Sequence, residues 1–184
     1  TGDPKYYQRE DLLTGIYQGV PFKFSDVKTR KVVRYGKLTK IENIFAGQVM
    51  CFFGFDRNKT SEGRLQIFRK EFLSDFSGWK AEHRIQTEDE VFNSQFEIYA
   101  EDEHNAFYIL TPRRMELIRK FSDAAGAQIS IVFWGEKMYV AAARQGMFDP
   151  VVDEPVAKQT ARIYEDIKIF QLAGNILAKT QTGG

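Results

Sequence analysis

The stretch 96–126 constrains the fold more than any other part of the chain. It begins with apolar residues that alternate with more polar ones, which is the period of a half-buried strand. Three successive acidic residues then interrupt the alternation, and the apolar segment 106–110 predicts a second strand. Thr111 followed by Pro112 is typical of a helix start, and Gly126 is typical of a helix end. We therefore predict a strand, an acidic turn, a second strand and a helix that ends before the glycine.

Two further regions predict antiparallel hairpins. Segments 128–134 and 137–143 are separated by Gly135-Glu136, a pair suited to a tight turn. The apolar run 49–55 and the alternating segment 64–68 are separated by a polar loop, which predicts another hairpin. Strands joined by hairpins and followed by helices favour an α+β fold. We predict a mainly antiparallel sheet of about seven to eight strands, with a mid-chain helix and a long C-terminal helix packed on it.

The C-terminal helix is predicted to start near Pro155, with Asp153 as its cap. Apolar and small residues then recur at spacings of four and three, namely Val156, Thr160, Ile163, Ile167, Phe170, Gly174 and Leu177. This stripe fits packing across the sheet, and it also fits pairing with a second helix. Thr160 and Gly174 weaken a self-sufficient coiled coil, so packing on the sheet is the favoured interpretation.

The length of 184 residues fits a single domain, 1–184, with flexible polar ends at 1–11 and 178–184. A net charge of +1 argues against a surface devoted to nucleic acid, so we expect no nucleic-acid partner. The sequence contains no run of 18 apolar residues, so it predicts no membrane span. The chain begins without a methionine, which is compatible with a piece of a longer protein.

Catalytic and metal-binding motifs are weak in this sequence. The histidines are His83 and His104, and neither is followed by a metal-ligand residue three or four positions later. Glu101, Asp102 and His104 form the strongest candidate pocket, although a solvated acidic turn is the simpler interpretation. The single cysteine, Cys51, lies in an apolar strand where burial keeps a thiol inert. We therefore predict no catalytic residue, no metal and no cofactor.

A run of basic residues is the best candidate for a surface that meets a partner. Segment 27–41 contains no acid and six basic residues: Lys28, Arg30, Lys31, Arg34, Lys37 and Lys40. Strand alternation places Lys28, Arg30 and Arg34 on one side of an exposed hairpin. Each cation near an anionic lipid surface contributes about 1 kcal/mol to binding. The alternative is a strand edge that lysine and arginine protect from pairing with other edges.

Several blocks of sequence carry a family resemblance. They are Gly19–Val27, Phe96–Tyr99 with Asp102, Ala106, Tyr108–Pro112 and Met115-Glu116, and the shorter Phe55-Asp56, Asn58-Lys59, Gly63-Arg64 and Phe148–Pro150. From about Tyr6 to Phe170, the chain resembles an uncharacterised bacterial family, the domain of unknown function 3137. The resemblance implies the soluble domain of a usually membrane-anchored protein, and it implies no activity or site. The basic segment and residues 73–90 depart from the family pattern.

Three functional hypotheses follow. The first is a non-enzymatic binding or scaffold module on the cytoplasmic side of a bacterial membrane, which contacts anionic lipid or a protein partner through the basic run. The second is a small-ligand-binding protein or enzyme with a pocket near residues 101–104. The third is a module that forms homo-oligomers through its last helix. The sequence alone leaves the ligand, the reaction and the oligomeric state open.

Overall fold

The computed structural model of the chain describes residues 6–35, 38–55, 63–70, 83–144 and 153–177. In this part of the chain, one sheet of eight strands has the order β1-β2-β3-β8-β7-β4-β6-β5, and all neighbouring pairs are antiparallel. The strands are β1 (Tyr6–Tyr17), β2 (Val20–Tyr35), β3 (Leu38–Phe53), β4 (Leu65–Arg69), β5 (His83–Ile85), β6 (Phe96–Ala100), β7 (Ile129–Trp134) and β8 (Lys137–Ala142).

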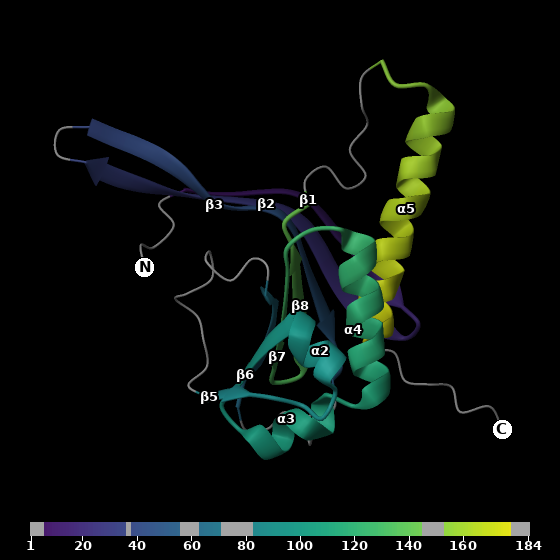
Figure 1. The fold of residues 1–184 in the computed structure, drawn as a ribbon. Coiled ribbons are helices and arrows are strands. Elements are labelled where there is room, and N and C mark those ends of the chain that lie inside the picture. Colours follow the sequence, from purple (N-terminus) through teal and green to yellow (C-terminus); the bar gives the residue numbers. More distant parts are fainter. Residues whose placement is uncertain (1–5, 36–37, 56–62, 71–82, 145–152, 178–184) are drawn as a thin grey trace.

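The described helices pack around this sheet. They are α2 (Glu90–Gln95), α3 (Glu103–Ile109), α4 (Pro112–Ala125) and α5 (Val156–Asn175). Figure 1 shows α4 and α5 side by side on one face of the sheet, with α2 and α3 near its lower end. The predicted α+β class is confirmed, as are the number of strands, the mid-chain helix and the long C-terminal helix.

The core lies between the sheet and α4 and α5. One row of directly paired, buried side chains crosses the sheet from β2 to β5: Phe24, Met50, Val140, Ile131, Ile67, Ile98 and Ile85. Helix residues such as Ile118, Phe121 and Ile169 belong to the same buried cluster. Because successive residues of a strand point to opposite faces, the residues between these positions lie on the face away from the two helices.

The start and end of α4 follow the sequence prediction. The Thr111 side chain accepts a hydrogen bond from the backbone N–H of Arg114, and Pro112 occupies the first turn. Gly126 ends the helix with a φ of 56°, a left-handed conformation that glycine adopts without steric cost. Helix α4 therefore has both of the end signals that the sequence carries.

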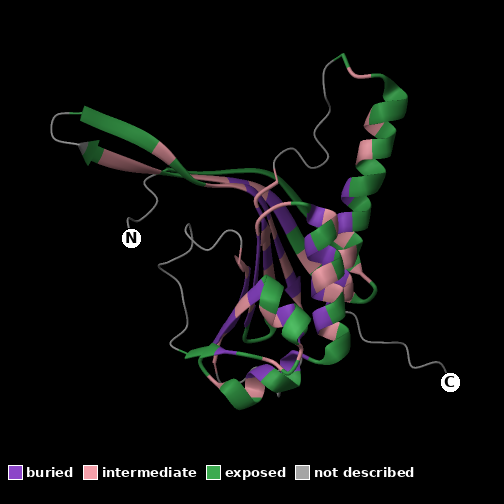
Figure 2. Cartoon of the chain, in the orientation of Figure 1, coloured by how far each residue is buried: buried purple, intermediate pink, exposed green. Residues whose placement is uncertain are grey.

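The C-terminal half of α5 packs on the core, whereas its N-terminal half extends away from it (Figure 2). Gly174 permits the close contact, because a Cβ there would lie 2.6 Å from Cδ1 of Tyr17. The predicted stripe is only partly correct, since Val156 and Ile163 are exposed. Asp166, Ile169 and Ala173 are buried instead.

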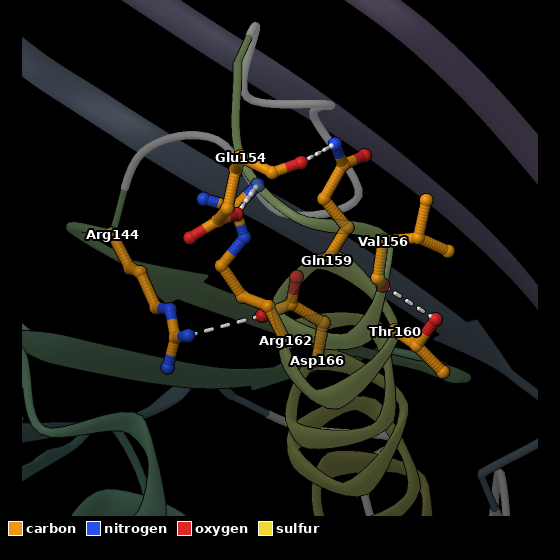
Figure 3. A network of polar contacts seen from close by, with 7 residues as sticks. All are labelled: Arg144, Glu154, Val156, Gln159, Thr160, Arg162 and Asp166. Carbon is orange, nitrogen blue, oxygen red and sulfur yellow. Dashed lines mark hydrogen bonds and ion pairs between the residues drawn. The ribbon is translucent and has the colours of Figure 1, made fainter.

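Polar contacts hold the exposed half of α5 near the end of β8, as Figure 3 shows. The carboxylate of buried Asp166 pairs with the guanidinium of Arg144 at 3.0 Å, and Arg162 pairs with Glu154 at 3.6 Å. The predicted cap, Asp153, is wrong, because Pro155 is the residue that precedes the first turn and no side chain caps it.

Two predictions about strands are also wrong, one about a segment and one about a pairing. Segment 106–110, predicted as a strand, belongs to α3, because the Asp102 side chain accepts from the backbone N–H of Asn105 and thereby caps a helix. Strands β3 and β4 do not form a hairpin, since β8 and β7 lie between them. Local sequence carries no information on this insertion, because the β7–β8 hairpin follows more than 60 residues later.

The N-terminal region differs from the predicted flexible end. Residues 6–11 form the first part of β1, where Tyr6 pairs with Arg30 and Glu10 pairs with Asp26. The predicted flexible end at 178–184 lies outside the described residues, as do residues 1–5.

Candidate functional site

The basic run forms a long hairpin arm. We use the name basic arm for residues 28–35 of β2 together with residues 38–46 of β3. The pairing of Lys31 with Glu42 and of Tyr35 with Leu38 confirms the predicted hairpin. Among the described residues, the pairing of β1 with the arm reaches the pair of Tyr6 and Arg30, and β2 and β3 form the described outer part of the arm. Figure 1 shows the arm projecting away from the sheet and from α4 and α5.

A shallow hollow lies where β1 joins the base of the arm. Its volume is about 530 Å³, and it is lined by Tyr6, Tyr7, Gln8, Lys28, Arg30 and Ile41. The antiparallel register brings these residues together, because Tyr6 pairs with Arg30 and Gln8 pairs with Lys28. Both tyrosines are more than half exposed. The hollow therefore joins two of the predicted basic residues to two aromatic rings that come from a distant part of the chain.

The charges of the arm fall into two groups. Lys31 and Lys40 share the carboxylate of Glu42, with Nζ to oxygen distances of 3.6 Å and 3.4 Å. Lys28, Arg30 and Arg34 form no ion pair with any residue that the structure describes. Lys37, the remaining basic residue of the run, lies outside the described residues. The arm consequently presents an excess of positive charge that its own acid does not neutralise.

Apolar side chains are exposed on the same arm. Leu38 is 75% exposed and Ile41 is 56% exposed, and Ile44 is also exposed. Exposed aliphatic residues on a projecting element are unusual on a surface that meets only water, and contiguous groups of them mark contact sites. The arm therefore combines cations and aliphatic side chains, with the two tyrosines of β1 at its base.

The residues of the alternative pocket are held in separate contacts. Glu101 accepts from the backbone N–H of Arg64 at 2.9 Å and lies 3.3 Å from its guanidinium. Asp102 caps α3, and His104 is exposed and stacks edge-on against Tyr108, with 4.9 Å between ring centroids. The structure thus gives both carboxylates partners within the protein.

A second hollow lies near this region, with a volume of about 600 Å³. It is lined by Gln86, Thr87, Glu88, Asp89, Phe107, Leu110, Pro112 and Met115. Its apolar floor includes the buried side chains of Leu110 and Met115. Residues 101–104 do not line it. Sequence reasoning missed this hollow because it forms only when α3, α4 and the segment before α2 meet.

Partial burial shifts the pKa of two half-buried side chains, Cys51 and Arg114. Burial raises the pKa of the Cys51 thiol, and the nearby ammonium groups of Lys137 and Lys23 oppose the shift. Burial lowers the pKa of Arg114, whose guanidinium donates to the backbone carbonyls of Ile109 and Ile176. Arg114 therefore joins the end of α3 to the end of α5.

The described residues hold no cluster of three or more side chains suited to a metal ion. None of the described helices has the length and hydropathy that crossing a membrane requires.

Comparison with known proteins assigns the chain to a family. The family described as Protein of unknown function (DUF3137) matches residues 43–180. The chain belongs to this family. The match begins within β3, so β1, β2 and the outer part of the arm precede the matched region of this DUF3137 domain. No curated protein matches the chain, and no solved structure matches it.

Sequence reasoning found the basic residues of the arm and missed the two tyrosines of β1 that lie at its base. Tyr6 and Tyr7 lie in a segment without apolar alternation, and the whole of β1 before Tyr17 is exposed. The two adjacent tyrosines were the available signal, but only the register of β1 on β2 shows which basic residues they accompany.

Proposed function

We propose that this domain is a non-enzymatic binding module that attaches to anionic lipid surfaces through the basic arm, as part of a membrane-associated bacterial protein. One observation carries the proposal. Lys28, Arg30 and Arg34 have no ion-pair partner among the described residues, they share the arm with exposed aliphatic side chains, and the exposed tyrosines of β1 lie at its base.

The energetic argument is simple. Three cations near an anionic bilayer supply together about 3 kcal/mol, at about 1 kcal/mol each. This corresponds to roughly a 150-fold gain in affinity over a neutral bilayer. Exposed residues such as Ile41 and Tyr7 add apolar contact with the boundary between headgroups and acyl chains, where aromatic side chains are favoured.

The position of the cations argues against edge protection as their main role. Lys28 and Arg30 lie in β2 where it pairs with both β1 and β3, so neither residue sits on an unpaired edge. Strand β1 is the outer strand there. Protection of an edge explains cations on an outer strand, and it does not explain these two.

Co-sedimentation with vesicles tests the proposal. We expect the protein to pellet with phosphatidylcholine vesicles that contain phosphatidylglycerol, to remain in solution with phosphatidylcholine alone, and to dissociate at high salt. A variant with Lys28→Glu, Arg30→Glu and Lys31→Glu should lose this binding.

A matched control separates the arm from overall charge. The triple variant Lys120→Glu, Lys158→Glu and Lys168→Glu makes the same change in net charge on the exposed surfaces of α4 and α5. It should retain most of the binding. The proposal fails if binding does not depend on anionic lipid, or if the two triple variants lose it equally.

A further inference from the structure

A second group of side chains lies at the opposite end of β2 and β3 from the arm. We call Lys23, Phe53, Trp134 and Lys137 the Phe53 cluster. The register brings them together, because Phe53 pairs with Lys137 and Lys137 pairs with Trp134, while Lys23 pairs with Cys51 two residues before Phe53. All four project from the face of the sheet away from α4 and α5, since the alternating neighbours Met50, Phe52 and Met138 are in the core.

Two ammonium groups flank one aromatic ring in this cluster. Lys23 Nζ lies 5.8 Å from the centroid of the Phe53 ring, and Lys137 Nζ lies 5.6 Å from it. Neither lysine forms an ion pair with a residue that the structure describes. Two like charges over the same ring repel each other, so an anionic group placed between them would relieve the repulsion.

The backbone fixes the position of the ring. The carbonyl of Glu136 accepts hydrogen bonds from the N–H groups of Gly54 and Phe55, both at 3.0 Å. These bonds tie the turn between β7 and β8 to the end of β3. The cluster is therefore built on paired strands and a bonded turn, which fix the backbone positions from which its side chains project.

The side chains of the cluster and its neighbours differ in exposure, and we call the half-buried ones the floor and the exposed ones the rim. Phe53, Cys51 and Tyr139 are half-buried, whereas both lysines are exposed and Trp134 is 62% exposed. A flat lipid surface would meet the rim and leave the ring of Phe53 uncovered. A polypeptide segment can place an apolar side chain on the floor while its neighbouring carboxylates reach the two ammonium groups.

We propose that the Phe53 cluster is a docking surface for an acidic segment of a partner protein, in which an apolar side chain is flanked by aspartate or glutamate. The site is separate from the basic arm. Lys28, where the arm begins, lies five positions along β2 from Lys23, which corresponds to about 17 Å at the rise of an extended strand. One end of the two long strands thus meets an anionic surface and the other end meets an acidic protein.

Alkylation of Cys51 gives a local measure of occupancy. It is the single cysteine of the chain, and it lies in the cluster's floor beside Lys23. The probe is a capped peptide with one phenylalanine between pairs of glutamates, and the reagent is neutral iodoacetamide at alkaline pH. At a peptide concentration ten times its Kd, the rate of alkylation should fall about tenfold. With Trp79 changed to Phe, the fluorescence of Trp134 should shift at the same concentration.

The controls distinguish binding of the acidic peptide from binding of a neutral peptide or of anionic vesicles. A glutamine version of the peptide should give no protection, and the variant Lys23→Gln with Lys137→Gln should abolish protection by the acidic peptide. The variant Lys28→Gln with Arg30→Gln should keep this protection, so failure of the arm and failure of the cluster are distinguished. The inference is overturned if the acidic peptide gives no protection up to its solubility limit, if the glutamine peptide protects equally, or if phosphatidylglycerol vesicles protect Cys51 as strongly as the acidic peptide.

Discussion

Neutralising Glu42 should strengthen the attachment of the arm to anionic vesicles. Its carboxylate holds Lys31 at 3.6 Å and Lys40 at 3.4 Å, and its side chain is the most protected of the three. Glu42→Gln removes one negative charge from the arm and releases both ammonium groups. One unit of charge near an anionic bilayer corresponds to about 1 kcal/mol, so the Kd should fall about fivefold. Stability should change by less than about 1 kcal/mol, because exposed ion pairs contribute little.

A gain of affinity is a stringent result, because a damaged fold does not produce it. The assay is a titration of the protein with phosphatidylglycerol-containing vesicles at fixed ionic strength, followed by sedimentation. Glu165→Gln is the control, since it makes the same change in net charge on the exposed side of α5. The reasoning is refuted if Glu42→Gln binds no tighter than the unmodified protein, or if Glu165→Gln tightens binding by the same factor.

Three further predictions concern the fold and the thiol. Arg114→Met should lower the free energy of unfolding by about 1 to 3 kcal/mol in urea denaturation, because the carbonyl of Ile176 loses its donor, whereas the carbonyl of Ile109 still accepts from the backbone N–H of Thr111. An unchanged free energy of unfolding contradicts this role. Thr111→Ala should cost about 1 kcal/mol through loss of the α4 cap, whereas Thr160→Ala on the exposed side of α5 should cost clearly less in the same assay. Because burial raises the pKa of Cys51, its alkylation rate should reach half of its maximum at a higher pH than that of a free thiol. Lys137→Gln should move that midpoint to still higher pH, since the ammonium lowers this pKa, and a downward shift would show the assignment to be wrong.

Features set by neighbouring residues could be predicted from the sequence. The β7–β8 hairpin has its tight turn at Gly135, with a φ of 58°, and α4 has a capping threonine and a terminal glycine. Each of these signals acts through contacts only a few residues apart. The basic run likewise predicted a hairpin, because its strands pair across a short connection.

Features set by distant residues could not be predicted. Segment 106–110 has the composition of a strand, but the Asp102 side chain caps α3, and β4 and β5 already pair with the two sides of β6. The tyrosines of β1 and the Phe53 cluster both depend on the register between strands that are far apart in the chain. The C-terminal half of α5 is positioned by the close approach of Gly174 to Tyr17. The periodicity of the helix does not reveal this contact.

Attachment through the basic arm is tested most directly by a spin label on the arm itself. The nitroxide is placed at Ile41→Cys in a Cys51→Ala background, and a second protein carries it at Ile163→Cys on the exposed half of α5. On phosphatidylglycerol-containing vesicles, the label at position 41 should lose access to a water-soluble relaxation agent and gain access to oxygen, while the label at position 163 should stay as accessible as in solution. A vesicle-bound protein whose label at position 41 remains fully accessible from water would contradict the account.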